Sequence, residues 1–594
     1  MTALKLLVKA TLLASLAQAA VCQQQVLRHV VPSAGGEVKR VVTPELSEYV
    51  EKVMKDNNVP GLALGVVHSN GTVELGAFGK KTEDDDGMTV DTLFDIASCS
   101  KAFLASAVGI LIDDFAQGRN QTALPPGVQK LDWHTKLADL FPDDWKLMDD
   151  WASRMVTLRD ILSHQSGLPR HDMSYRSTDK PIDVIRRMRH LRPAFELRQR
   201  WHYNNQFYMT GAHIVSTFSG QPYTNFVKER ILDPIGMWTT TFSPAEATHS
   251  GKLTQVWTAK GRRIPFWFPD SAMELNAGPG GVISNVVDMT KWVRILLNAG
   301  VDPETNRTVI PRATYDVITQ SHSIVSTKPG QSWFSTETYG MGWFIKSYQG
   351  HQIWTHSGSI PGFAAEVFFL PNSGLGIVSL ANGDGKHQQE LAVVYRIIED
   401  FLGLEHKESD RMLEIALQDK GRQKEDRDED STKEIASPAP PSLPLEAYAG
   451  TYFDPGYGKF TLCAPSADPS EACEDILRKW SFFENTTDAT RAVLYTAIGS
   501  AWNTHLRLEH KDGDKFALSG TALFPEGYGK DKSPFRLEEG DAAAPAEFMV
   551  EDGTEGAKVL GVALNGLVGE TTEAQRIGGT IEQTAEIWLK RVST

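Results

Sequence analysis

Ser98 and Lys101 are the two residues of this 594-residue chain whose types and spacing most clearly suggest chemistry. They lie three positions apart, where a polar loop gives way to the apolar run AFLASAVGILI, so a helix starting here would place both side chains on one face. A serine hydroxyl becomes a nucleophile when a base takes its proton, and a lysine can be that base when burial or nearby cations lower its pKa. An N-cap serine beside a solvated lysine would give the same pattern. The spacing also recurs at Ser177 and Lys180, where a proline follows instead of an apolar helix.

Two other segments carry groups that could complete a catalytic site. Tyr203 and Asn205 supply a phenol and an amide just ahead of a second apolar helical run. The tripeptide His356-Ser357-Gly358 lies at the end of a predicted strand, whose edge N–H groups could bind an oxyanion. Together with the serine and lysine, these segments provide a nucleophile, proton carriers and groups that could hold a substrate.

In these three segments the sequence resembles the serine β-lactamase and penicillin-binding-protein superfamily, and most closely its class C β-lactamase-like, S12-peptidase-like branch. Further segments look similar to the same family: VTLRDILSHQSGLP, AGPGGVISNVVDMTKWV, YGMGWF and ANGDG. The resemblance extends from about Thr43 to Leu404. It implies an α/β (α+β) fold of the β-lactamase/transpeptidase type, with an antiparallel sheet flanked by helices and a helical lobe.

The resemblance also implies catalytic roles for three residues. Ser98 would be the acylated nucleophile, and Lys101 and Tyr203 would share the general-base and general-acid work. The reaction would then be a two-step acyl transfer, in which a carbonyl is attacked, the leaving group departs and water releases the acyl group. The resemblance thus implies a serine hydrolase that cleaves an amide or ester, as a peptidase or esterase does.

Four further residues would bind the substrate if the resemblance holds. Asn205 would hold the substrate amide, His356 and Gly358 would line the opposite wall, and the N–H of Ser359 would form the oxyanion hole with that of Ser98. The third family motif normally carries a lysine, whereas a histidine is mostly neutral at pH 7. This departure weakens the case for penicillins or C-terminal peptide carboxylates as substrates. A true β-lactamase and an inactive protein that binds peptides or wall polymers remain the alternatives.

Local patterns predict the elements that would position these residues. Thr43 can cap a helix that ends near Asn58, and Asn70-Gly71 joins two apolar runs in a typical hairpin signal. An amphipathic helix is predicted over residues 391–402. Late strands are predicted at 352–355, 363–370 and 376–381. The simplest assembly pairs the early and late strands in one antiparallel sheet, with the mostly helical middle as a second lobe.

The composition changes after Leu404. Residues 406–444 contain an almost wholly charged stretch followed by a proline-rich one, which predicts a linker after a hydrolase domain at 40–405. From Leu445 onward, short strand-like runs alternate with turns, which predicts a small all-β barrel or sandwich at 445–594. Its start, LEAYAGTYFDPGYGKFTL, resembles the lipocalin-like tail of some members of the same family.

The first residues are typical of a secretory signal. A basic start and a short apolar run precede Ala17-Gln18-Ala19, which has the form of a signal-peptidase site, so residues 1–19 are predicted to be a signal peptide and the protein to be secreted. The run is too short for a membrane anchor. Cys463 and Cys473 could close a disulfide loop in an oxidising compartment. Glycosylation sequons, which suggest a glycoprotein, occur at Asn70, Asn120, Asn306 and Asn485.

Composition narrows the choice of partners. The net charge of −15 disfavours nucleic acid and anionic membranes as partners. No Cys/His pattern has zinc-ligand spacing, and acidic runs such as Glu83–Asp86 are predicted to be solvated loops, so we expect neither a metal nor another cofactor. His164 is predicted to make a structural hydrogen bond and Gly280-Gly281 a tight turn. The expected partners are a small-molecule or peptide substrate and, through the C-terminal β domain, a second copy of the chain.

Overall fold

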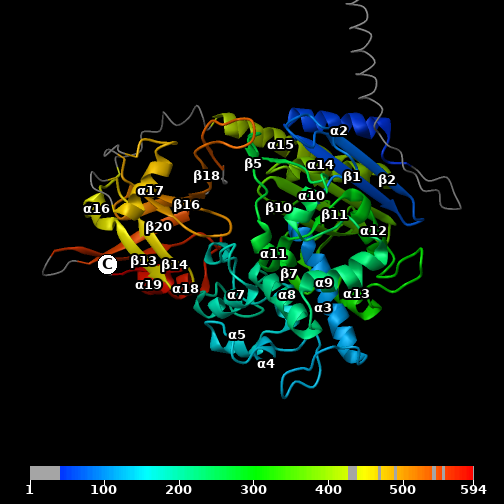
Figure 1. Cartoon of the computed structure of the whole chain (residues 1–594), viewed down its shortest axis with the longest axis horizontal. Helices are drawn as coiled ribbons and strands as arrows, with labels where there is room; N and C mark the ends of the chain where they lie inside the picture. Colours follow the sequence, from blue (N-terminus) through cyan, green and yellow to red (C-terminus); the bar gives the residue numbers. More distant parts are fainter. Residues whose placement is uncertain are drawn as a thin grey trace, which may run out of the picture.

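The computed structural model describes residues 40–425, 438–465, 470–486, 491–537, 544–551 and 556–592. The predicted signal peptide lies outside these residues. The described chain forms a mixed domain, in which helices cover an antiparallel sheet, beside a second domain built mainly from strands (Figure 1). The predicted fold class is therefore confirmed.

The large sheet of the first domain has eight strands in the order β2-β1-β12-β11-β10-β9-β8-β7. The strands are β1 (Gly61–His68), β2 (Val73–Gly79), β7 (Ser323–Ser326), β8 (Glu337–Tyr339), β9 (Phe344–Tyr348), β10 (His351–Ile360), β11 (Phe363–Leu370) and β12 (Leu375–Ala381). The predicted hairpin is β1–β2, and β1 pairs with β12 in the register Gly65↔Val378. The early and late strands thus meet in one antiparallel sheet, as predicted.

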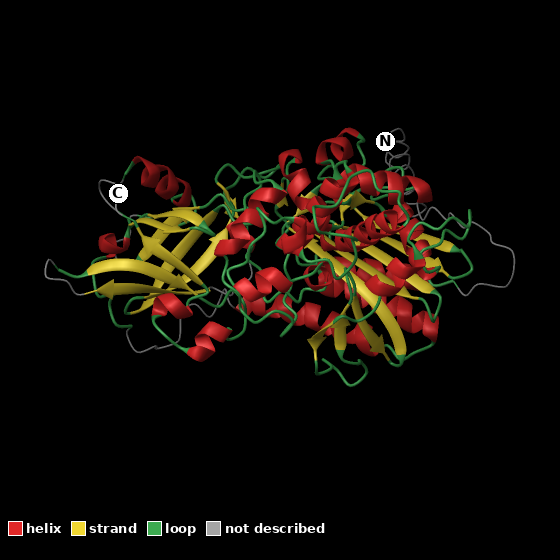
Figure 2. Ribbon diagram, turned by 90° about the horizontal axis from the view of Figure 1, so that it is seen from below, coloured by secondary structure: helices red, strands yellow, loops and turns green. Residues whose placement is uncertain are grey.

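Helices pack on both faces of this sheet (Figure 2). One face is covered by α2 (Pro44–Asp56) and α14 (His387–Leu402), and the other by α12 (Val286–Leu297). Alternate residues of β1 enter the two cores: Leu64 packs on the side of α2 and α14, and Ala63 on the side of α12. Helix α2 begins where the sequence predicts, because the Thr43 hydroxyl accepts a hydrogen bond from the N–H of Leu46.

The middle of the chain forms the predicted helical lobe. Its longest helices are α3 (Lys101–Ala116) and α8 (Gln206–Ser219), which pack against each other. The other helices of this region are α4 (Leu137–Leu140), α5 (Asp150–Met155), α6 (Leu158–Leu162), α7 (Pro181–Arg187), α9 (Tyr223–Val227), α10 (Pro244–His249), α11 (Met273–Gly280) and α13 (Arg312–Ile318). Short paired strands stand between them: β3 (Phe94–Asp95) with β6 (Ile283–Ser284), and β4 (Val256–Trp257) with β5 (Arg263–Ile264).

The first part of the predicted linker is a helix, which corrects that prediction. Helix α15 (Lys407–Glu425) packs against α14 and buries Met412 and Ala416. The buried Glu399 of α14 accepts hydrogen bonds from the backbone N–H and the hydroxyl of Ser409. The many charged residues of this segment make its few apolar residues easy to overlook in the sequence. These apolar residues recur at helical spacing, which is enough to pack the helix on the domain. Residues 426–437 of the predicted linker lie outside the described residues.

The C-terminal domain is an eight-stranded antiparallel sheet in the order β14-β13-β22-β21-β20-β17-β16-β15. Its strands are β13 (Gly450–Asp454), β14 (Gly458–Leu462), β15 (Val493–Ala497), β16 (His505–Asp512), β17 (Lys515–Thr521), β20 (Ala544–Glu551), β21 (Lys558–Leu564) and β22 (Ile587–Arg591). Cys463 and Tyr495 exchange backbone hydrogen bonds at 2.8 and 2.9 Å, so the two edge strands meet and the sheet closes into a barrel. Tyr452 and Phe548 are among the side chains that fill its interior.

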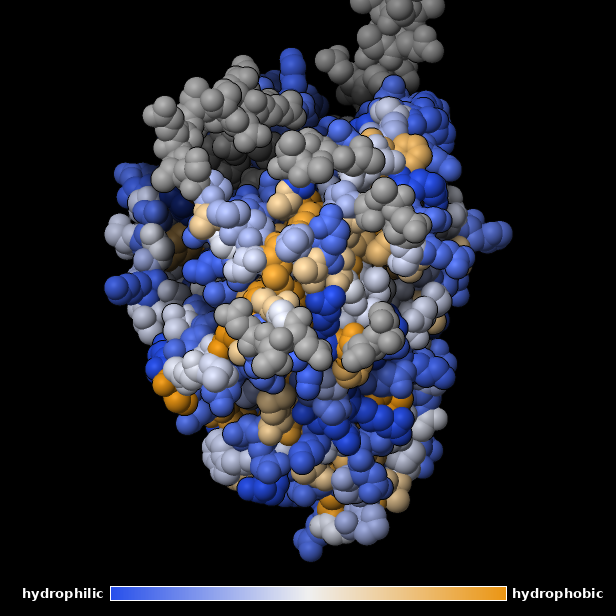
Figure 3. Space-filling model, turned by 90° about the vertical axis from the view of Figure 1, so that its left-hand side faces the viewer, coloured by the Kyte–Doolittle hydropathy of each residue, from blue (hydrophilic) through white to orange (hydrophobic). Residues whose placement is uncertain are grey.

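Smaller elements decorate this barrel. They are α16 (Leu445–Tyr448), α17 (Glu471–Trp480), α18 (Glu573–Ile577), α19 (Ile581–Thr584) and the short hairpin of β18 (Leu523–Phe524) with β19 (Phe535–Arg536). Cys463 and Cys473 form a disulfide that ties α17 to the barrel, as the sequence predicts. The surface on this side of the molecule is mainly hydrophilic, with apolar side chains in small groups (Figure 3).

Candidate active site

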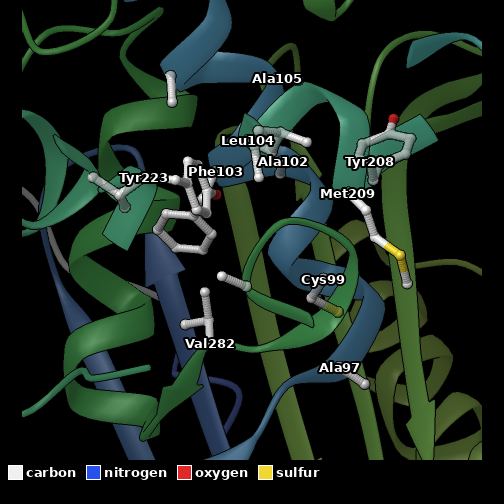
Figure 4. Packing of buried hydrophobic residues seen from close by; sticks show 14 of the residues in the cluster. Ala97, Cys99, Ala102, Phe103, Leu104, Ala105, Tyr208, Met209, Tyr223 and Val282 are labelled. Carbon is white, nitrogen blue, oxygen red and sulfur yellow. The ribbon is translucent and has the colours of Figure 1, made fainter. Parts of the chain in front are cut away.

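Ser98 lies on a single 3₁₀ turn, Ala97–Ser100, that leads directly into α3. Figure 4 shows its neighbours Ala97 and Cys99 just ahead of Ala102 in that helix. Two side-chain contacts fix this turn. Ala97 has a φ of 45°, a strained value for a residue with a Cβ, and its N–H donates a 2.7 Å hydrogen bond to the carboxyl group of Asp95. The Ser100 hydroxyl accepts a 3.0 Å bond from the N–H of Val282. The half-buried Ser98 is thus held at the N-terminal end of a buried helix.

Lys101 is the first residue of α3 and is fully buried. Its Nζ lies 3.1 Å from Ser98 Oγ, 2.9 Å from Asn205 Oδ1 and 2.7 Å from the carbonyl oxygen of Pro279. A neutral amine has two N–H groups and one lone pair. When the amide and carbonyl oxygens take the two N–H groups, the lone pair is left for the serine hydroxyl.

The electrostatic environment favours this neutral amine. Burial, aided by the nearby Arg170 guanidinium, holds the pKa of Lys101 well below its usual range. Tyr203 lies on the other side of the serine, with its hydroxyl 2.8 Å from Ser98 Oγ. Burial raises the pKa of this phenol, so the group stays protonated and can donate.

Asn205, directly ahead of α8, connects the lysine to an ion pair. Its Nδ2 donates to both carboxylate oxygens of Asp172, at 3.3 and 3.4 Å. Asp172 in turn forms a 2.7 Å ion pair with Arg170, whose guanidinium lies 5.1 Å from the centre of the Tyr203 ring. Burial alone would raise the pKa of Asp172, but Arg170 together with the hydrogen bonds from Tyr175 and Asn205 outweighs it, and the pKa stays below its ordinary value. The negative charge of Asp172 is therefore linked to the Lys101 amine through two hydrogen bonds, with the Asn205 amide between them.

The third motif lies inside β10, which is longer than predicted. His356 is buried, with its ring nitrogens bonded to the Tyr339 hydroxyl at 3.1 Å and to the carbonyl oxygen of Ser357 at 2.7 Å. Burial, followed by the repulsion of Lys101, lowers its pKa to about 3, so the ring is neutral. A Cβ on Gly358 would lie 2.1 Å from the carbonyl oxygen of Ile96, which explains why only glycine fits where β10 passes the turn that carries Ser98.

A small cleft lies beside Ser98, with a volume of about 350 Å³ when the open solvent at its mouth is included. Asn205 and Ser359 are among the residues that line it, whereas His356 and Gly358 are not. The full lining consists of Ala97, Ser98, Arg170, Tyr175, Asn205, Met209, Phe268, Asn276, Pro279, Gly280, Ser359, Ile360 and Trp502. The structure thus brings Ser98, Lys101, Tyr203 and Asn205 together, whereas His356 and Gly358 are not among the lining residues of the cavity.

Several residues of this site carry no clear signal in the sequence. Pro279 contributes a backbone carbonyl, which any residue type could supply, and it lies in α11 just before the predicted Gly280-Gly281 turn. Arg170 and Asp172 follow the family-like segment that ends at residue 169, and this proximity is the only hint of their role. Trp502 comes from the other domain.

The described residues contain neither a metal-ligand cluster nor a membrane-spanning helix. No cluster of three or more His, Cys, Asp or Glu side chains there has the arrangement of a metal site. In the same residues, no helix combines the length and the apolar character needed to cross a bilayer.

Comparison with known proteins places this site in a family. Residues 46–399 match the family described as Beta-lactamase. The chain is 28% identical to the unguisins hydrolase ungD' of Aspergillus campestris (strain IBT 28561) over 442 residues, which cover 70% of this chain and 77% of that relative. It is 24% identical to penicillin-binding protein 4 of Amycolatopsis lactamdurans, over 57% of this chain and 84% of that protein.

Among solved structures, the fold resembles that of the octameric penicillin-binding protein homologue from Pyrococcus abyssi. The TM-score is 0.52 at 18% sequence identity, and the match covers 88% of this chain and 97% of that one. The match therefore extends beyond the mixed domain into the barrel. With the family match covering more than half of its residues, the chain belongs to the Beta-lactamase family.

Proposed function

We propose that this protein is a secreted serine hydrolase that cleaves an amide or ester bond through an acyl-enzyme on Ser98. The observation that carries the proposal is the contact of Ser98 Oγ with two different groups, the Lys101 amine at 3.1 Å and the Tyr203 phenol at 2.8 Å. One group is able to accept a proton and the other to donate one, and both face the same hydroxyl beside a cavity.

The proposed first step starts with neutral Lys101. Its lone pair takes the proton of Ser98 Oγ as that oxygen attacks the substrate carbonyl carbon. The backbone N–H groups of Ser98 and Ser359 bind the negative oxygen that forms, a contribution worth about 3 kcal/mol per donor in comparable sites. The phenol of Tyr203 gives its proton to the departing amine or alcohol, which leaves the acyl group on the serine. Water then attacks this ester and gives a proton to the Tyr203 phenolate, while the Lys101 ammonium returns its proton to Ser98 Oγ as the acid is released.

The substrate is proposed from the third motif and from the names of the relatives. His356 is neutral and buried, so the third motif offers no cation for a substrate carboxylate, and we place amides and esters ahead of penicillins. The relatives named as unguisins hydrolases make unguisins the first natural compounds to assay. Asn205, which lines the cavity, is proposed to bind the substrate amide.

Two further parts of the proposal concern the whole protein. Secretion is supported by the Cys463–Cys473 disulfide, since such bonds persist in oxidising compartments. Self-association is supported by the octameric state named for the Pyrococcus abyssi homologue, whose fold is similar.

Labelling with an active-site alkyl fluorophosphonate, followed by mass spectrometry, tests the catalytic proposal. We expect one adduct, on Ser98, that is lost in Ser98→Ala and kept in Ser177→Ala. The second variant is the matched control, because Ser177 has the same spacing to a lysine. Folded protein without any adduct on Ser98 would refute the enzyme and favour a binding protein.

A further inference from the structure

The barrel domain reaches into the candidate active site through one loop. Residues 498–504 connect β15 to β16, and a 2.8 Å bond from the N–H of Ile498 to the carbonyl of Thr504 closes the base of the loop. The tip is clamped from two sides of the mixed domain. Ala501 donates its N–H to the carbonyl of Tyr175 at 3.0 Å and accepts a 3.1 Å bond from the indole of Trp267. The tip of the loop therefore lies in the domain interface, held there by hydrogen bonds to Tyr175 and Trp267 of the mixed domain.

Trp502, at this tip, forms part of the cavity beside Ser98. Its ring meets the ring of Phe268 edge to face, with centroids 5.3 Å apart. Met209 and Ile360 add further apolar surface to the same cavity. One part of the cavity is therefore built from apolar side chains of both domains, while Ser98, Arg170 and Asn205 are among the residues that supply polar groups to it.

Hydrogen bonds fix the position of this indole. Trp502 Nε1 donates to the Tyr175 hydroxyl at 2.7 Å, and that hydroxyl donates to Asp172 Oδ1 at 2.9 Å. The same carboxylate accepts from Asn205, whose other end meets Lys101. A chain of bonds thus links the barrel loop to the proposed base, and the ring has little freedom to swing out of the cavity.

We propose that Trp502 is a specificity-determining residue of the hydrolase, which limits the size of the apolar group on the acyl side of the scissile bond. The inference rests on the proposed acyl-enzyme function. In this proposal the acyl carbon sits between Ser98 and Ser359, and the group attached to it enters the cavity that Trp502 and Phe268 help to line. The substrates assigned by this geometry are acyl donors with an apolar side chain that is short enough to fit against the indole.

The test uses p-nitrophenyl esters of acetate, butyrate and octanoate, which share one leaving group, so the comparison reports the acyl side alone. In Trp502→Ala we expect the ratio of kcat/KM for octanoate to kcat/KM for acetate to rise at least tenfold. Trp502→Phe keeps a ring but loses the indole N–H, so its ratio should stay within threefold of wild type. Phe482→Ala, an exposed aromatic residue of the same domain, is the matched control and should leave the ratio unchanged.

The outcomes separate the two proposals. An unchanged ratio in Trp502→Ala, or an equal loss of activity on all three esters, overturns the role of Trp502 while Ser98-dependent hydrolysis still stands. Wild-type protein that hydrolyses no ester faster than Ser98→Ala refutes the proposed function itself. Trp502→Leu, with the same expected direction, takes the place of Trp502→Ala if thermal unfolding shows that the alanine variant is not folded.

Discussion

At the scale of single residues, the proposed mechanism depends on the charge state of Lys101. A protonated amine has no lone pair, so the ammonium form of Lys101 cannot take the serine proton. Burial lowers the pKa of this amine, and the Arg170 cation lowers it further. The neutral fraction therefore rises as the pH rises through this lowered pKa, and activity should rise with it.

Arg170→Gln tests this balance. The substitution removes the nearby cation and leaves the negative charge of Asp172 less compensated, and both changes raise the pKa of Lys101. We expect the acid limb of the pH profile of kcat/KM to move to higher pH by about one unit. The exposed Arg186, paired with Asp144 away from the cavity, gives the control variant Arg186→Gln. A limb that stays in place, or that moves to lower pH, would contradict the assignment of Lys101 as base.

At the scale of elements, a buried carboxyl group of strand β3, that of Asp95, bonds to the turn that carries Ser98. Asp95 is 2% exposed and accepts the N–H of Ala97, and burial raises its pKa to about 8. Between pH 4 and 8 the folded protein therefore keeps a proton on Asp95 that the unfolded chain loses. Because the folded state binds more protons, the free energy of unfolding falls as the pH rises through this window.

Asp95→Asn should remove this dependence. The amide oxygen can still accept from Ala97, while nothing remains to ionise, so the variant should be more stable than wild type at pH 8 by a few kcal/mol, at about 1.4 kcal/mol per unit of pKa difference. The advantage should shrink towards zero near pH 4. Thermal unfolding across this range measures it, with the exposed Asp143→Asn as control. An equal shift at pH 4 and pH 8 would show that Asp95 is ionised in the folded protein.

The elements that the sequence predicts well are those with local causes. The β1–β2 hairpin follows from its turn residues, and α2 follows from its cap and proline. Helix α15 is not predicted, because charged residues dominate its sequence and its apolar stripe is narrow. Ser98, Lys101, Tyr203 and Asn205 could be assembled from family-like motifs, although the spacing alone could not bring them together.

The rest of the site depends on contacts that no local pattern encodes. The carbonyl of Pro279 accepts a hydrogen bond from Lys101 only because α11 packs against the turn that carries Ser98. His356 does not line the cavity as expected, because its ring points towards the hydroxyl of Tyr339. Trp502 reaches the cavity only because the barrel domain contacts the mixed domain, so its neighbours in sequence give no sign of this position.

At the scale of the whole molecule, a neutral histidine joins the two domains. His171, in the mixed domain, is 4% exposed, and its Nδ1 lies 2.6 Å from the hydroxyl of Tyr457 in the barrel. Its Nε2 lies 2.9 Å from the carbonyl of Arg192, which requires a proton on Nε2 and leaves Nδ1 as the acceptor for the phenol. Protonation of Nδ1 would remove that acceptor at the centre of the interface.

Burial lowers the pKa of His171 to about 4. As the pH falls from about 6.5, the unfolded chain binds a proton that the folded protein refuses until about pH 4, so this residue makes the free energy of unfolding fall across that window. His171→Gln, which keeps an amide acceptor and donor, should reduce the drop in unfolding temperature between pH 6.5 and pH 4.5 relative to wild type, as differential scanning calorimetry would record. The exposed His134→Gln controls for the loss of a histidine as such. If the unfolding temperature of His171→Gln drops as much as that of wild type, another group causes the acid sensitivity. If the drop is smaller in His171→Gln and unchanged in His134→Gln, the contact of His171 with Tyr457 is the acid-sensitive contact between the mixed domain and the barrel.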